Sequence, residues 1–79
     1  MPQFFFDLHD DRGASPDDTG LEMTDGEVAS REAVAALWSI GKERTRTTSP
    51  VTRISVRDAQ GRVIFAAALT LFTEPAAEG

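Results

Sequence analysis

The segment Phe4-Phe5-Phe6-Asp7-Leu8-His9-Asp10-Asp11 holds three of the five phenylalanines and the only histidine of this 79-residue chain. Phe4, Phe6 and Leu8 occupy alternate positions, which is the period-2 pattern of a strand that buries one face. Phe5 falls on the other face. The sequence therefore predicts a first strand over residues 3–9, and the aspartates that follow predict an acidic loop at its end.

The acidic loop leads into a second, shorter strand. Residues 10–18 contain a glycine, a proline and four aspartates without periodicity, which is typical of a loop. Residues 20–23 are then expected to form a strand in which Leu21 and Met23 point inward. The two strands would pair as a hairpin with a long acidic connection.

A helix is expected after this hairpin. Thr24-Asp25-Gly26-Glu27 matches a capping box, in which Thr24 and Glu27 satisfy each other's backbone N–H groups. The helix should continue to residues 42–44. Five apolar residues share one arc of its surface and predict its buried face: Ala29, Ala33, Ala36, Leu37 and Ile40.

Two further strands complete the predicted fold. Residues 45–50 favour a polar loop, residues 52–58 a strand, residues 58–61 a tight turn and residues 62–73 a long strand. This last strand is apolar on both faces, which predicts a position inside the sheet beside the first strand, with residues 20–23 at an edge. We expect an α+β fold with the order β-β-α-β-β: a four-stranded, mainly antiparallel sheet with one helix packed on one face. Residues 1–75 would form one domain and residues 76–79 a disordered tail.

Trp38 is the apolar side chain that this fold does not explain. It lies beside Val34 and Arg31 on the helix face that should meet water. Either the loop after the helix folds back over the indole, or Trp38 contacts another protein, since tryptophan is enriched at interface hot spots. A single helix also leaves one face of the sheet uncovered. The predicted interaction surface comprises Phe5, Val34, Trp38, Ile64 and Phe72.

Charge and composition limit the functions to consider. The net charge is −5, but residues 1–27 carry eight acids and one arginine, while residues 28–62 carry seven bases and three acids. Such a dipole can orient a partner, or it can simply keep a small domain solvated. The chain has no cysteine, which excludes disulfides, thiolate zinc sites and cysteine nucleophiles. No apolar run approaches the roughly 20 residues of a membrane span and no secretory signal is visible, so we expect a cytoplasmic protein.

The carboxylates near the first strand form the segment most open to a chemical role. The four residues Asp7, His9, Asp10 and Asp11 invite a hard-cation hypothesis, together with Asp17 and Asp18 farther along the loop, but the spacing does not match a calcium loop. His9 shares a strand face with Asp7 and could act as a base, yet no serine lies in a nucleophile elbow. We therefore expect no catalytic residue, no metal and no cofactor, and keep these four residues as a candidate functional loop.

Four arginines raise a nucleic-acid hypothesis: Arg44, Arg46, Arg53 and Arg57. A sheet face with aromatics and arginines can stack bases and neutralise phosphates. The isoelectric point near 4.6 and the acidic first third of the chain argue against it. We do not expect nucleic acid as a partner.

The ordered motifs MPQFFFDLHD (residues 1–10), DTGLE (18–22), SREA (30–33) and VRDAQGRV (56–63) resemble a family of short, mostly alphaproteobacterial proteins of unknown function. The resemblance covers nearly the whole chain and implies no activity or cofactor. The opening strand, acidic turn and helix are also similar to antitoxin domains of the HicB type. The leading expectation is a non-enzymatic protein-interaction module or homodimer, and the alternative is an antitoxin-like or RNA-associated regulator.

Overall fold

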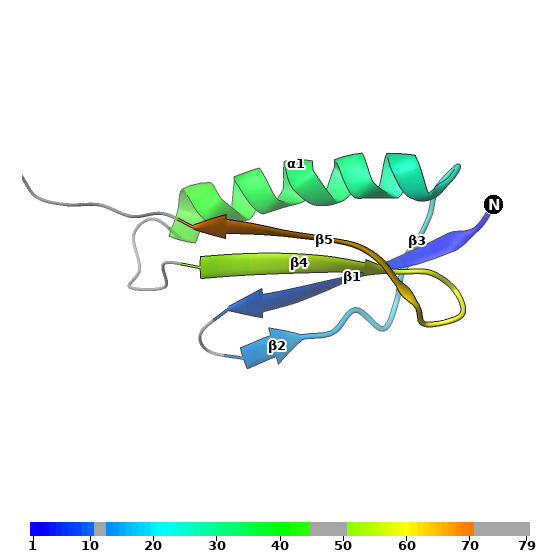
Figure 1. Cartoon of the computed structure of the whole chain (residues 1–79), viewed down its shortest axis with the longest axis horizontal. Helices are drawn as coiled ribbons and strands as arrows, with labels where there is room; N and C mark the ends of the chain where they lie inside the picture. Colours follow the sequence, from blue (N-terminus) through cyan, green and yellow to red (C-terminus); the bar gives the residue numbers. More distant parts are fainter. Residues whose placement is uncertain (11–12, 45–50, 71–79) are drawn as a thin grey trace, which may run out of the picture.

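A computed structural model describes residues 1–10, 13–44 and 51–70. One helix, α1 (Gly26–Arg44), covers one face of an antiparallel sheet (Figure 1). The strands are β1 (Gln3–Asp10), β2 (Gly13–Ser15), β3 (Leu21–Glu22), β4 (Val51–Arg57) and β5 (Val63–Thr70). The α+β fold, with one helix on one face of a mainly antiparallel sheet, is thus confirmed, with one strand more than predicted.

The core lies between α1 and the middle of the sheet. The alternation of the first strand is confirmed, because Phe4 is buried and Phe6 and Leu8 pack against the core. Ile54 and Val56 of β4 point inward as predicted. The helix contributes buried Ala29, Ala33 and Leu37, and its small alanines let it lie close to the strands.

The extra strand is β2, which lies inside the segment predicted as a loop. It pairs antiparallel with the end of β1, where Ala14 faces His9. All three of its residues are exposed, so it has no apolar alternation from which a strand could be predicted. Farther along, β3 pairs with the start of β1 and confirms the expected hairpin. Leu21, expected to point inward, is 57% exposed because β3 is only two residues long and lies at the rim.

The position of the last strand corrects the predicted topology. The order across the sheet is β2-β1-β4-β5, so β5 is an edge strand and β4, not β5, lies inside beside β1. Apolarity on both faces suggested a central strand, but the centre of β5 consists of alanines, whose small side chains cost little when exposed. On the side of β5 away from β4, no strand pairs with it within the described ranges.

The start of the helix also differs from the prediction. The cap is Asp25 and not Thr24, because Asp25 Oδ1 accepts a hydrogen bond from the Val28 backbone N–H at 3.0 Å. Aspartate and threonine both cap helices, so the residue types alone do not show which of these two neighbours is the cap. Glu27 pairs with Arg31 instead of reaching back to Thr24. The predicted turn at 58–61 is confirmed: the Gly61 N–H donates to the Asp58 carbonyl, and Gly61 has φ 84°.

Candidate functional site

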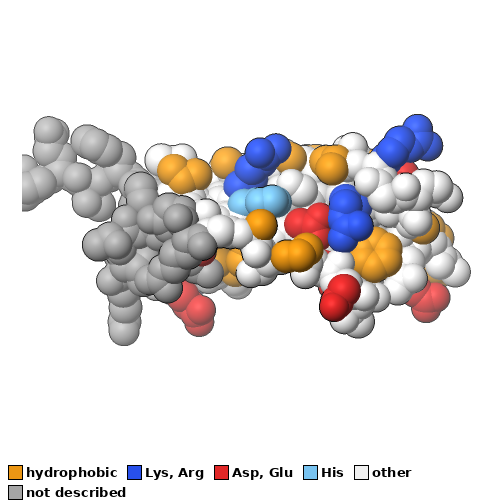
Figure 2. Space-filling view, turned by 90° about the horizontal axis from the view of Figure 1, so that it is seen from below, with side chains coloured by type: hydrophobic (Ala, Val, Ile, Leu, Met, Phe, Trp, Pro, Cys, Tyr) orange, Lys and Arg blue, Asp and Glu red, His pale blue; other side chains and the backbone are white. Residues whose placement is uncertain are grey.

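The sheet face opposite α1 carries an ion pair between neighbouring strands. Arg57 Nε of β4 donates to Asp7 Oδ2 of β1 at 2.6 Å, and Arg57 Nη2 donates to Asp7 Oδ1 at 3.1 Å. Figure 2 views the molecule from this side, and acidic and basic side chains lie against each other near the middle of the described surface. The geometry is the bidentate one that makes arginine–carboxylate pairs strong and directional.

Asp17 extends this pair into a network that holds the segment between β2 and β3. Its carboxylate accepts the backbone N–H groups of Phe6, Thr19 and Gly20. Its own N–H donates to Asp7 Oδ1 at 2.8 Å, and its carbonyl accepts Arg57 Nη2 at 2.9 Å. Between the residues of β1 that pair with β3 and those that pair with β2, the Asp17 carboxylate thus accepts the hydrogen bond that a paired strand would accept.

These contacts shift the protonation equilibria of all three groups. The hydrogen bond from Arg57 holds the pKa of Asp7 below its ordinary value, despite the opposing effect of burial. The Phe6 N–H does the same for the pKa of Asp17. The Asp7 carboxylate raises the pKa of Arg57. Each group is therefore held in its charged form. Such groups are better suited to stabilising the fold than to donating or accepting protons at neutral pH.

The residues of the candidate functional loop lie in different surroundings. Asp7 is only 8% exposed, and its carboxylate accepts hydrogen bonds from the Arg57 guanidinium and from the Asp17 N–H. His9 lies on the same face, opposite Arg53 of β4, and Asp10 ends β1. Asp11 lies outside the described residues. Among the residues that the structure describes, no group of three or more His, Asp or Glu side chains is placed to hold a metal ion.

Phe5, one residue of the predicted interaction surface, contacts Arg57 of the same network. The Arg57 guanidinium lies over its ring, 5.1 Å from the centroid. Gly20 also lies close to this ring, because a side-chain Cβ there would come within 2.8 Å of Phe5 Cε2. Phe5 thus faces away from the helix and lies against Arg57 and Gly20 of its own chain.

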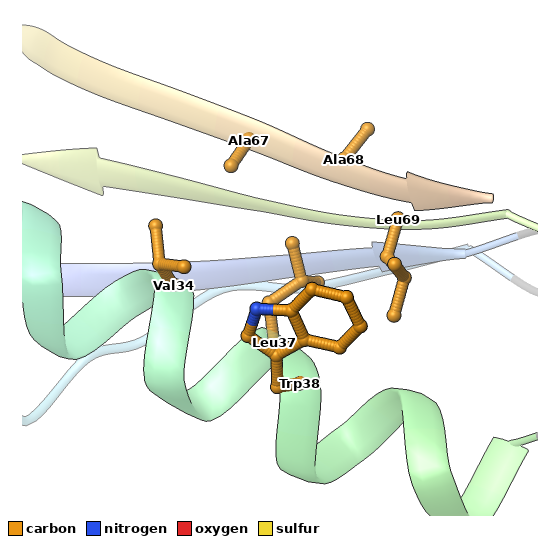
Figure 3. A pocket seen from close by; sticks show the side chains of 6 residues that line it. All are labelled: Val34, Leu37, Trp38, Ala67, Ala68 and Leu69. Atoms are coloured by element: carbon orange, nitrogen blue, oxygen red, sulfur yellow. The ribbon is translucent and has the colours of Figure 1, made fainter.

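A second feature, the groove between α1 and β5, brings together two residues of the predicted surface. Figure 3 shows Val34 and Trp38 of α1 beside Ala67 and Leu69 of β5, which point toward the helix, while Ala68 points away. The hollow measures about 150 Å³. Trp38 is 62% exposed at its rim and Val34 is 37% exposed, so the structure leaves both accessible.

The other two residues of that surface are not part of the groove. Ile64 was expected on the uncovered face, but its Cδ1 lies 3.1 Å from the position of a Cβ on Gly26, at the start of α1. A register shift explains this: Val56 pairs with Phe65 and Arg57 with Val63, which leaves Ile64 as the extra residue of a bulge. Phe72 lies outside the described residues, as do the 45–50 loop proposed to cover Trp38 and the 76–79 tail.

Sequence reasoning missed two residues of the network. Arg57 was considered as a nucleic-acid contact, and Asp17 as part of the acidic loop and of the hard-cation hypothesis. The strand alternation did place Asp7 and Arg57 on the uncovered face, so opposite charges on one sheet face were the signal that could have paired them.

The comparison with protein families finds a match over most of the chain. A family model described as a domain of unknown function (DUF6894) matches residues 3–70, from the start of β1 to the end of β5. The chain belongs to the DUF6894 family. The matched span includes both the Asp7–Arg57–Asp17 network and the α1/β5 groove of this DUF6894 domain. No curated protein and no solved structure matches the chain. Along its described part, no helix is long and apolar enough to cross a membrane.

Proposed function

We propose that this DUF6894 chain is a non-enzymatic protein-interaction module of the cytoplasm, which binds an extended segment of another polypeptide along β5. The observation that carries the proposal is the combination of an edge strand without a described partner on one side and an exposed tryptophan beside it. Location and lack of enzymatic activity are part of the proposal and rest on the sequence.

The backbone of β5 supplies the binding energy in this account. An edge strand presents a row of N–H and C=O groups that a second strand can pair with. Over its eight residues β5 has none of the lysines or prolines that commonly protect an edge. Addition of a strand at such an edge is a common way for proteins to recognise extended peptides.

The α1/β5 groove supplies the side-chain contacts. Its volume of about 150 Å³ is well below the roughly 300–1,000 Å³ of small-molecule sites, so it suits one side chain of a docked strand better than a cofactor. Trp38 and Val34 form its outer rim. Covering a tryptophan that is 62% exposed is the kind of contact that dominates interface energetics.

A photo-crosslinking experiment tests the proposal. A photoreactive phenylalanine analogue replaces Trp38 in one variant and Glu32, which is exposed on the other flank of α1, in a control. Both variants are irradiated in the organism that encodes the chain. We expect a crosslinked polypeptide at position 38 and none at position 32. Equal crosslinking at the two positions, or none at either, would contradict the proposal.

The antitoxin-like or RNA-associated regulator remains the alternative. It draws support from Arg53, which is exposed on the uncovered face opposite His9. Against it, the charge of Arg57 is already matched by Asp7. A gel-shift assay with RNA at low salt decides between them, since phosphate contacts are strongest there. The interaction-module proposal predicts no retardation.

A further inference from the structure

We propose that the strand that β5 receives is β5 of a second copy of this chain, paired antiparallel about a two-fold axis. This inference rests on the proposed function and names its partner. Identical chains most often associate with two-fold symmetry, in which the same patch meets itself. Two β5 strands related by such an axis through the sheet run antiparallel and would join the two sheets into one.

The composition of β5 allows two copies of this strand to pair with each other. Val63–Thr70 contains no charged residue. In a symmetric pair every residue faces the same short sequence, so a charge near the axis would meet its own copy and repel it. The strand has alanines at its centre, so small side chains would face each other across the axis.

Three aspartates near β1 and β2 lie away from this edge. The net charge of −5 opposes association of two copies in general. However, Asp10, Asp17 and Asp18 lie on the β1–β2 side of the sheet, whereas β5 is the strand farthest from β2. The β2 edge is also only three residues long. Two copies can therefore meet at β5 with their acidic edges on the outside.

The helix and the edge strand can share one symmetry axis. They run in the same direction (Figure 1), with Gly26 beside Ile64 and Gly41 beside Leu69. Val34, Leu37 and Trp38, near the middle of α1, lie beside Ala67, near the middle of β5. An axis through the middle of β5 would thus pass close to the middle of α1 and set the two helices antiparallel, side by side on one face of the joined sheet.

This arrangement would cover the exposed residues of the helix. Arg31, Val34 and Trp38 lie within about 60° of one another at ~100° per residue, so they form one stripe. In the antiparallel helix pair, Trp38 of one copy meets Val34 and Arg31 of the other. The indole would then be buried against an aliphatic side chain and a guanidinium, a favourable pairing for tryptophan. Antiparallel helix dipoles also attract each other.

Cysteine crosslinking tests the pairing directly, because the chain has no cysteine of its own. Ala66→Cys and Ala68→Cys each place one thiol on the uncovered face near the proposed axis. A disulfide spans Cα atoms roughly 4.4–6.8 Å apart. An axis at residue 66 or 68 sets that residue opposite its own copy, whereas an axis at Ala67 sets residue 66 opposite residue 68 of the other copy, so the two variants are oxidised singly and as a mixture. The control is Ala14→Cys, which lies on β2 in the same cross-strand row as Ala68, at the opposite edge of the sheet.

We expect at least one β5 variant, or the mixture of the two, to form a disulfide-linked dimer about tenfold or more faster than Ala14→Cys under mild oxidation. Adding Trp38→Ala should slow that reaction. If neither β5 variant nor their mixture, shown to be folded by circular dichroism, crosslinks faster than Ala14→Cys, the self-pairing is wrong. The identity of the band at position 38 separates the two proposals: a different protein alone would overturn self-pairing and leave the proposed function standing, whereas no band overturns both.

Discussion

Arg57 and Asp7, fifty residues apart in the sequence, form a bidentate ion pair across β4 and β1, with Nε and Oδ2 2.6 Å apart. The same guanidinium contacts the Asp17 carbonyl and the Phe5 ring. One side chain therefore links the central strand to the first strand and to the segment that follows β2. This network lies on the uncovered face of the sheet, whereas the α1/β5 groove lies between the helix and the edge strand.

Removing the carboxylate should destabilise the fold. Asp7→Ala leaves Arg57 without its carboxylate partner and the Asp17 N–H without its acceptor, which we expect to cost about 2 kcal/mol of unfolding free energy. The matched control is Asp18→Ala, an exposed neighbour of Asp17. Urea unfolding measures both. Equal midpoints for the two variants would show that the network adds no stability.

The same carboxylates predict an acid-sensitive stability. Asp7 and Asp17 have pKa values below their ordinary value in the folded chain, so the unfolded chain binds protons first as the pH falls. The stabilisation is complete above about pH 4, the pKa of a free aspartate, and is lost as the pH drops through the lower folded-state values. The free-energy difference between wild type and Asp7→Asn, measured by urea unfolding, should therefore shrink below pH 4. A difference that stays constant to pH 2 would contradict this.

The helix cap offers a test at neighbouring residues. Asp25→Ala removes the acceptor of the Val28 N–H and should cost about 1 kcal/mol. Thr24→Ala should have little effect, because the capping box expected from the sequence does not form. Thermal unfolding followed by circular dichroism measures both variants. A larger loss of stability for Thr24→Ala than for Asp25→Ala would show that the capping box forms after all.

Gly41 is needed where the helix approaches the edge strand. A Cβ at this position would overlap the Leu69 side chain. Gly41→Ala should therefore destabilise the chain by about 1–3 kcal/mol, although alanine is the better helix former. Ser39→Ala, on the exposed side of the same turn, is the control and should be neutral or slightly stabilising. If Gly41→Ala raises the unfolding midpoint as much as Ser39→Ala does, α1 does not approach β5 so closely.

Elements that bury one face could be predicted from the sequence, and the exposed β2 could not. β1, α1 and β4 carry clear apolar periodicities, and the structure confirms them. β2 is held by backbone hydrogen bonds and Asp17 by its carboxylate, and neither leaves an apolar pattern. The edge position of β5 was missed because alanine fits a buried and an exposed face equally well.

The candidate site shows the same division. Helical periodicity was enough to place Trp38 and Val34 together outside the core, since the angle between them depends only on their spacing. Which strand lies beside them depends on the order of the sheet, which local patterns do not encode. The Asp7–Arg57 pair likewise joins two strands whose adjacency is a property of the whole fold.

Amide hydrogen exchange at different protein concentrations tests the pairing of β5 most directly. Its backbone groups on the free edge should exchange quickly in dilute solution and become protected as the concentration rises, whereas β2, at the other edge, should exchange at an unchanged rate. This result is predicted if β5 pairs with its own copy. Exchange from β5 that is independent of concentration and as fast as from β2 would contradict the account.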